Sequence, residues 1–224
     1  MEHIVAEILA AAARDGWVLE PDAKALLARI GIDVPAGRVA HSEEEAITIA
    51  RELNSAVVAK VVSSEIIHKT EVDGVITGLR GDDAIRGAFA RFSRLSGFRG
   101  MLIEEMVSGV ELIVGGRFDA QFGAVVLLGI GGTGVEIYRD VVVRLAPVEA
   151  ADVPAMISEL IGAPLLAGHR GAPVANTAAL AETVAVFSRL LAALGPRFSS
   201  ADLNPVFCSP TRCVVADARI LIEG

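Results

Sequence analysis

Lys60, His68 and Lys69 are the first group of side chains in this sequence that could do chemistry together. Lys60 lies in an apolar run, residues 56–62, that is typical of a buried strand, and the other two follow in a polar segment. A buried ammonium is costly unless an anion compensates it, so the three side chains could form a cationic pocket for an anionic ligand. Lys60 also has a purely structural interpretation, in which its ammonium extends to solvent at the strand end or pairs with a carboxylate of the core.

His68 has three interpretations of its own. It is a hydrogen-bonded loop histidine, a metal ligand or an acceptor of a phosphoryl group. A metal ligand is the weakest of the three, because no second histidine follows at the spacing of metal ligands. A neutral imidazole beside Lys69 is a nucleophile that could take up a phosphoryl group.

Two strands near the end of the sequence, residues 201–208 and 213–222, flank a turn at Ser209–Arg212. A symmetric turn sets Cys208 opposite Cys213, Asn204 opposite Asp217 and Asp202 opposite Arg219. Directly opposed residues hold their Cβ atoms roughly 4.5–5.5 Å apart. Asn204 and Asp217 could therefore offer two oxygens to one Mg²⁺, with Asp202 on the same face. The alternative is a polar sheet face with an Asp202–Arg219 ion pair.

A pair of glutamates, Glu104 and Glu111, flanks a short glycine-containing segment in the middle of the chain. A strand, a turn and a new strand would bring both carboxylates toward one cleft. One of them could accept a hydrogen bond from a ribose hydroxyl, and the backbone of Met106 and Val107 could pair with an adenine edge. The alternative is that both are ordinary exposed glutamates at strand ends.

The glycine-rich segment Gly129–Gly134 resembles a dinucleotide-binding fingerprint only superficially. It precedes residues 135–138, which predict a strand, whereas that fingerprint must open a helix. It also lacks the lysine of a Walker A loop. A flexible loop or a close approach of the backbone explains the glycines better.

The elements that must position these residues follow from periodicity and capping signals. Helices are predicted at 4–14, from Pro21 to Gly31, from the Ser42 capping box to Asn54, at 82–95, at 150–160 and at 177–194, the last capped by Asn176. Strands are predicted at 56–62, 74–79, 101–103, 111–115, 124–129, 141–145, 201–208 and 213–222. This order predicts an α/β (α+β) fold with a smaller α/β lobe at residues 1–98 and a strand-rich lobe at 99–224.

Composition excludes several classes of function. The net charge is −8 and only 4% of the residues are aromatic, which argues against nucleic-acid binding. The N-terminus does not look like a signal sequence, and no uninterrupted apolar run reaches the ~18 residues of a membrane span. Two cysteines are too few for a disulfide framework, so we expect a cytoplasmic protein with reduced thiols, although Cys208 and Cys213 could crosslink under oxidation.

Taken together, these motifs resemble the ATP-grasp module of the ADP-forming acyl-CoA synthetases, specifically the β subunit of ADP-forming acetate–CoA ligase. The resemblance covers nearly the whole chain, and it rests on an ordered set of short stretches rather than on one of them. The stretches are residues 23–27, 31–35, 60–63, 68–75, 105–107, 119–123, Gly131–Gly132 with Glu136, Asp140, 144–147, 166–171, 202–206 and 216–220.

The resemblance implies a role for each candidate residue. Lys60 corresponds to a lysine that contacts ATP phosphates, and Lys69 lies beside it in the nucleotide site. Glu104, Met106 and Val107 correspond to the hinge that binds adenine, and Glu111 to a ribose-binding glutamate. Asn204 and Asp217, with Asp202, correspond to the magnesium site. His68 corresponds to a histidine that is phosphorylated in a mobile loop.

The resemblance also implies an ATP-grasp fold of two lobes with the nucleotide between them, ATP or ADP with Mg²⁺ as cofactors, and a CoA-binding α subunit as partner in an α₂β₂ assembly. We expect that partner to be a separate chain, because the sequence ends shortly after the proposed magnesium strand. Two alternatives are a nucleotide-binding regulatory module without turnover and another ATP-grasp ligase, such as a succinyl-CoA synthetase β chain.

Overall fold

The computed structural model describes residues 1–132, 140–168 and 173–223, which form two compact units. The smaller unit is Pro35–Met106, and the larger combines Met1–Val34 with Val107–Gly224. These boundaries differ from the expected division into 1–98 and 99–224. The first two helices pack in the larger unit, and the strand that ends at Glu105 is central to the sheet of the smaller one.

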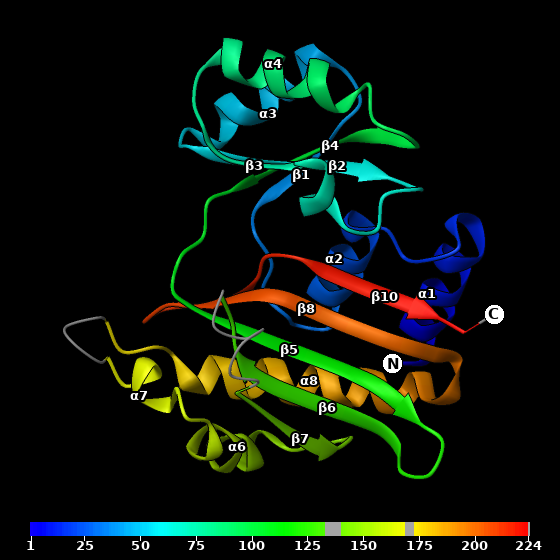
Figure 1. The fold of residues 1–224 in the computed structure, drawn as a ribbon, viewed down its shortest axis with the longest axis vertical. Helices are drawn as coiled ribbons and strands as arrows, with labels where there is room; N and C mark the ends of the chain where they lie inside the picture. The colour runs from blue at the N-terminus through cyan, green and yellow to red at the C-terminus, as the bar shows by residue number, and fades with distance from the viewer. Residues whose placement is uncertain (133–139, 169–172, 224) are drawn as a thin grey trace. The chain divides into compact units, whose positions relative to one another are not determined.

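The smaller unit is a four-stranded antiparallel sheet with two helices on one face (Figure 1). Its strand order is β1 (Gly37–Ala40), β4 (Phe98–Glu105), β2 (Val57–Ser63) and β3 (Val75–Leu79). The helices are α3 (Glu43–Leu53) and α4 (Asp82–Phe92). Ser42 caps α3 by accepting the backbone N–H of Glu45 at 3.2 Å, as the capping box predicts.

Alternation along β2 and β4 decides which side chains face those helices. Ala59 and Val61 of β2 and Ile103 of β4 belong to the buried cluster that α3 and α4 cover. Since neighbouring residues of a strand point to opposite faces, the even-numbered residues in the middle of β2 and near the end of β4 project from the other face. Lys60 and Glu104 are among them.

The larger unit is built on an antiparallel sheet with the order β10–β8–β5–β6–β7, and β9 also pairs with β8. The bounds are β5 (Val110–Asp119), β6 (Gly123–Ile130), β7 (Val141–Leu145), β8 (Phe198–Cys208), β9 (Cys213–Val215) and β10 (Ala218–Ile222). Its helices are α1 (Glu2–Asp15), α2 (Glu20–Arg29), α6 (Val153–Glu159), α7 (Ala163–Leu166) and α8 (Thr177–Leu194), and short 3₁₀ turns occur at Ala150–Asp152 and Gly195–Arg197.

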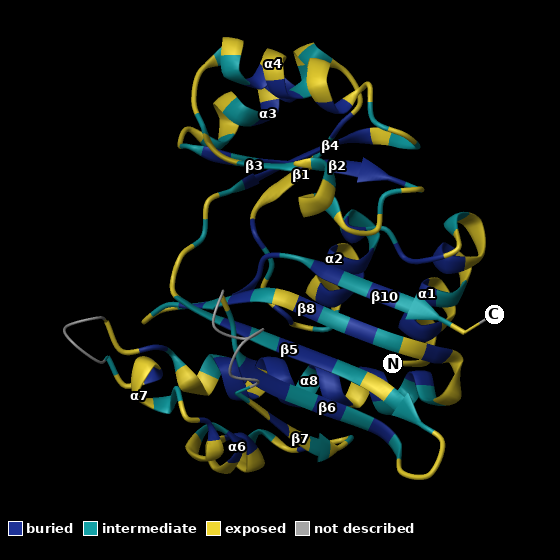
Figure 2. Ribbon diagram, viewed as in Figure 1, coloured by how far each residue is buried: buried dark blue, intermediate teal, exposed yellow. Residues whose placement is uncertain are grey.

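Helix α8 lies along one face of this sheet and is largely buried, as Figures 1 and 2 show. The predicted cap is present, because the Asn176 side chain accepts the backbone N–H of Ala179 at 3.0 Å. Among the described residues, the segment Thr177–Arg197 is the one helical stretch long and apolar enough to cross a membrane. Its apolar side chains pack into the core of the larger unit, which accounts for its composition without a membrane.

Most predicted elements are present. Strand β1 and helix α7 were not predicted, and the expected strand at 213–222 is divided into β9 and β10. The expected strand at 135–138 lies outside the described residues, as do positions 133–134 of the glycine-rich segment and the loop at 169–171.

Candidate functional site

Lys60 and Glu104 form a buried ion pair on the sheet face opposite α3 and α4. The register of β2 with β4 sets Val58 opposite Glu104 and Lys60 opposite Leu102, so Lys60 and Glu104 are diagonal neighbours. Lys60 Nζ lies 3.0 Å from Glu104 Oε2, and the two side chains are only 7% and 4% exposed. The structural interpretation of Lys60, pairing with a core carboxylate, is therefore correct for this structure. Glu104 forms an ion pair with Lys60. This contact was not part of the role expected for Glu104 in the adenine-binding hinge.

His68 lies at the surface of the smaller unit, in the segment between β2 and β3. It immediately precedes a 3₁₀ turn at Lys69–Val72. The carbonyl of Lys69 accepts the backbone N–H of Gly74 at 2.6 Å, which closes the far end of the segment. His68 is exposed and Lys69 is half-buried, so the imidazole is accessible to a reactant from solvent.

Ser63 anchors the near end of the same segment. It belongs to the matched stretch 60–63, but no role was predicted for it from the sequence. Its buried hydroxyl accepts the backbone N–H groups of Glu65 at 3.0 Å and Ile66 at 3.1 Å, and it donates to the Ser96 carbonyl at 2.7 Å. The signal was a serine at the end of an apolar strand, directly before a polar loop. Such a serine forms local hydrogen bonds to following backbone groups.

Met106 and Val107 fall at the junction between the two compact units, since the smaller ends at Met106 and the larger resumes at Val107. Met106 is 46% exposed, and its sulfur accepts the backbone N–H of Gly78 at 3.1 Å. Their expected contacts with adenine remain a prediction.

Glu111 lies at the start of β5, against the beginning of the glycine-rich segment. Its carbonyl accepts the backbone N–H of Gly131 at 2.6 Å. A Cβ at Gly131 would lie 2.7 Å from Cγ of Glu111, so a larger residue there would displace the glutamate. The backbone of Gly131 thus lies close to that of Glu111, the residue proposed to bind ribose, as expected for the glycine-rich segment.

Asn204 and Asp217 lie opposite each other, as the symmetric turn predicts. The pairs Cys208–Cys213 and Asp202–Arg219 are both in the observed register. The backbone N–H of Asn204 donates to the Asp217 carbonyl at 3.1 Å, at the gap between β9 and β10. Asn204 is exposed and Asp217 half-buried, so the local structure fits two hard oxygen ligands near solvent, the kind that Mg²⁺ takes.

A bulge in β8 presents Asn204 on the open face of the larger sheet. Leu112 and Val114 of β5 face Val206 and Leu203, so β8 has one residue more than β5 over this interval. Such a bulge re-aims side chains. Leu203 and Val206 are both buried, and the extra residue leaves Asn204 exposed between them.

The Asp202 carboxylate forms an ion pair with the Arg219 guanidinium. Arg219 Nη2 lies 2.8 Å from Asp202 Oδ2, and each side chain is 29% exposed. The described residues contain no cluster of three or more histidine, cysteine or acidic side chains arranged to hold a metal. The ion pair expected as the alternative is therefore present, and Asp202 as a magnesium ligand remains a prediction.

An apolar cavity of about 870 Å³ opens on the sheet face opposite α8. Asp119 at its rim accepts the backbone N–H groups of Gln121 and Phe122, which holds the pKa of its carboxyl below the usual range. The lining residues include Ile113, Gly115, Arg117, Phe122, Val125, Leu127, Val141, Val143, Ser200 and Asp202. The cavity therefore combines apolar walls with charged groups on the strands that neighbour the proposed metal ligands.

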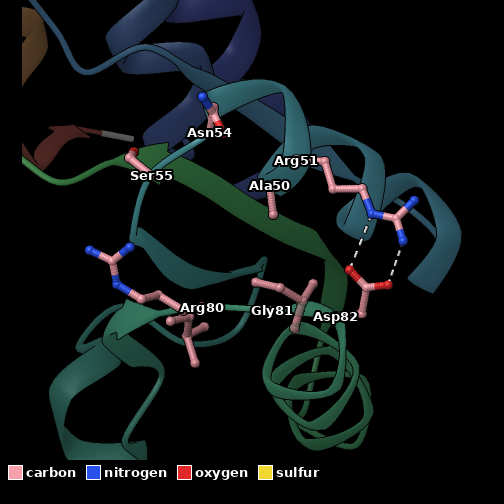
Figure 3. A pocket seen from close by; sticks show the side chains of 9 residues that line it. Ala50, Arg51, Asn54, Ser55, Arg80, Gly81 and Asp82 are labelled. Atoms are coloured by element: carbon pink, nitrogen blue, oxygen red, sulfur yellow. Dashed lines mark hydrogen bonds and ion pairs between the residues drawn. The ribbon is translucent and has the colours of Figure 1, made fainter.

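A second cavity, of about 450 Å³, lies in the smaller unit where α3 ends and α4 begins (Figure 3). Arg51 and Asp82 bridge the two helices across it with contacts of 2.5 and 3.2 Å. This hydrogen-bonded guanidinium lowers the pKa of Asp82. The cavity contains none of the predicted site residues, so it is separate from the proposed chemistry.

Asp140 is a further residue whose role was not predicted from the sequence. Its carboxylate accepts the backbone N–H of Ile161 at 2.8 Å and of Gly162 at 2.7 Å. Its carbonyl accepts the N–H of Ile130 at 3.1 Å. Asp140 thus joins the end of β6 to the turn before α7. The signal was an aspartate directly before a strand, which does not reveal a partner so distant in sequence.

Comparison with known proteins defines the class. The pattern of the ATP-grasp domain family matches residues 9–222, so this chain belongs to that family. Among its relatives are β subunits of ADP-forming acetate–CoA ligases. The chain is 37% identical over 213 residues to the acetate–CoA ligase [ADP-forming] I subunit beta of Pyrococcus furiosus, covering 92% of this chain and 91% of the relative.

Other relatives are longer proteins of which this chain matches one part. It is 37% identical over 212 residues to acetate–CoA ligase [ADP-forming] II of Archaeoglobus fulgidus, but spans only 30% of that protein. A solved structure of the dinucleotide-forming acetyl-coenzyme A synthetase 1 of Ca. Korarchaeum cryptofilum, in complex with coenzyme A and Ca-AMPCP, superposes with a TM-score of 0.89. It is 35% identical and covers 96% of this chain and 98% of the solved chain. The predicted ATP-grasp fold is confirmed.

Proposed function

We propose that this chain is the nucleotide-binding β subunit of an ADP-forming acyl-CoA synthetase. The overall reaction is acyl-CoA + ADP + phosphate ⇌ carboxylate + CoA + ATP. The observation that carries the proposal is the opposition of Asn204 and Asp217 on β8 and beside β10, in a chain that matches a β subunit over nearly its full length. A solved relative from Ca. Korarchaeum cryptofilum contains Mg-AMPPCP, which supports ATP or ADP and Mg²⁺ as the ligands.

The proposal gives each candidate residue one part of the nucleotide chemistry. Lys60 and Lys69 neutralise phosphoryl oxygens, while Met106 and Val107 contact adenine. Glu111 accepts a hydrogen bond from a ribose hydroxyl. Asn204 and Asp217, with Asp202, would hold Mg²⁺, whose positive charge stabilises the charge of the transferring group. Glu104 holds Lys60 by their 3.0 Å contact and so limits the freedom of its ammonium before the nucleotide arrives.

His68 relays the phosphoryl group. An imidazole nitrogen forms a bond to the γ-phosphorus of ATP as the bond to the leaving ADP oxygen breaks, and in the opposite direction ADP takes the group back. Exposure of His68 on a segment anchored at both ends supports this role. The solved relative from Ca. Korarchaeum cryptofilum has a phosphohistidine segment pointing towards its nucleotide-binding site, which supports this role for His68.

The partner in this proposal is a CoA-binding α subunit in an α₂β₂ assembly, active in the cytoplasm. It would hold the acyl group and CoA, and this chain would exchange phosphoryl groups with it. This chain matches a separate β subunit along most of its length, and it matches one part of longer ligases. These matches support an enzyme whose nucleotide-binding and CoA-binding parts are separate chains or domains.

The test is acid-labile phosphorylation by radiolabelled ATP. We expect label on the wild-type chain and on His3→Asn, a matched exposed histidine, and none on His68→Asn, while all three bind Mg-ATP. Label that persists in His68→Asn, or its absence from the wild-type chain at saturating Mg-ATP, would contradict the relay. Binding without label would favour a regulatory module.

A further inference from the structure

Cys208 and Cys213 are the two cysteines of the chain, and they lie directly opposite each other on β8 and β9. The next pair toward the turn is hydrogen-bonded, because the backbone N–H of Ser209 donates to the Arg212 carbonyl at 2.8 Å. Hydrogen-bonded and non-hydrogen-bonded pairs alternate along an antiparallel ladder, so the cysteines form a non-hydrogen-bonded pair. Such pairs have Cα atoms about 4.5 Å apart, within the range of roughly 4.4–6.8 Å that a disulfide spans.

We propose that Cys208 and Cys213 form a reversible thiol–disulfide site, which a low-molecular-weight disulfide oxidises without rearrangement of the fold. One thiolate attacks a sulfur of the small disulfide and releases a small thiol. The second cysteine then attacks the mixed disulfide and releases the other small thiol. The protein loses two hydrogen atoms and two electrons, and one small disulfide becomes two thiols.

The environment of the pair supports this chemistry. The hydrogen bond from Cys213 holds the pKa of the Cys208 thiol below its ordinary value, and the same contact together with burial raises the pKa of Cys213. Cys208 is therefore the thiol that ionises first and attacks. Both sulfurs are buried, but they lie one pair behind the turn, whose Pro210 and Thr211 are exposed, so local opening of the turn admits a small oxidant.

Oxidation also leaves no buried group without a partner at this position. The Cys208 thiol donates to the Asn176 carbonyl at 3.3 Å, and that bond is lost in the disulfide. The same carbonyl also accepts the backbone N–H of Leu180 at 3.1 Å, which remains. The backbone N–H of Asn176 in turn donates to the Ser209 carbonyl at 2.8 Å. The proposed disulfide would therefore crosslink the β8–β9 hairpin, which contacts the start of α8 through this bond.

The test is equilibration of the native chain with oxidised and reduced glutathione, followed by an acid quench, alkylation and intact mass measurement. We expect oxidising mixtures to give a monomer that is lighter by two hydrogen atoms, with neither thiol alkylated, and reduction to reverse the change. The crosslink should raise the Tm by about 4 °C or more. Two free thiols under fully oxidising conditions, or a disulfide-linked dimer, would overturn the proposal.

The single-cysteine variants give the matched controls. Cys213→Ser should stop at a mixed disulfide with one glutathione per chain and should show no rise in Tm on oxidation, and Cys208→Ser should react more slowly. If a variant does not fold, the mass of the wild-type chain still decides the question, because no other cysteine can form the intramolecular bond. A stable mixed disulfide as the end product of the wild-type chain would also overturn the proposal.

Discussion

Lys60 and Glu104 show how a single buried pair prepares a site at the residue scale. Their side chains are almost fully buried on the sheet face opposite the apolar core of the smaller unit. Removing two charges from water is costly, and a contact of 3.0 Å compensates only part of that cost. The presence of this buried ion pair is therefore better explained by the proposed binding of phosphates by Lys60 than by a contribution to stability.

The prediction at this scale concerns the free energy of unfolding. Lys60→Met should lower it by about 3–5 kcal/mol, because Glu104 keeps a buried charge while its cation is lost. Glu104→Leu should have a similar cost, and the double variant should recover most of the loss. Urea denaturation of the four proteins measures the coupling. Additive single effects would show that the two side chains do not stabilise each other.

The sequence predicted contacts between residues on either side of one short turn, but not contacts between residues far apart in the sequence. The opposition of Asn204 and Asp217 follows from a short turn, which sets the register for every pair behind it. The partnership of Lys60 with Glu104 depends on β2 pairing with β4, strands separated by β3 and α4 in the chain. No local pattern contains that information.

At the scale of elements, the segment between β2 and β3 is held at its ends and exposes His68 between them. Ser63 holds the start, and the contact of Gly74 with Lys69 holds the end. For the proposed relay, the segment that carries His68 must be able to move the imidazole while its first residues stay fixed to the sheet. The buried Ser63 hydroxyl fixes those first residues, because it accepts two of their backbone N–H groups.

We predict that Ser63→Ala destabilises the protein by roughly 1–3 kcal/mol, because two backbone N–H groups lose their acceptor. It should also slow phosphorylation of His68 while leaving Mg-ATP affinity near the wild-type value. The control is Ser64→Ala, whose hydroxyl accepts a longer contact of 3.4 Å from Arg99. Denaturation and label incorporation are the measurements. Equal rates in the two variants would remove Ser63 from the positioning of His68.

Elements with strong terminal signals were predicted best. Helix α8 begins after the Asn176 cap and ends before Gly195, as expected. Strand β1 was missed because Gly37–Ala40 is a short edge strand without a period of its own. The interruption between β9 and β10 was missed because residues 213–222 contain no glycine or proline to mark a break, and it accompanies the irregular pairing of β8.

At the scale of the whole molecule, the chain crosses between its two units twice, at Val34–Pro35 and at Met106–Val107. The expected division at about residue 98 was placed at a glycine-rich stretch, which is a local signal. Unit membership instead follows from long-range packing, since α1 contacts β10 and α8, and α2 contacts β10. The family was predictable because many weak motifs occur in one order, and the match over residues 9–222 confirms it.

Calorimetric titration of the purified chain with ATP, with and without Mg²⁺, tests the central claim most directly. We predict one site that requires Mg²⁺, with binding weakened by about 2–4 kcal/mol in Asp217→Ala and unchanged in Asp22→Ala, a half-buried aspartate paired with Arg14. Affinity that is independent of Mg²⁺, or equal in Asp217→Ala and the wild-type chain, would contradict the assignment of the metal site and with it the proposed phosphoryl chemistry.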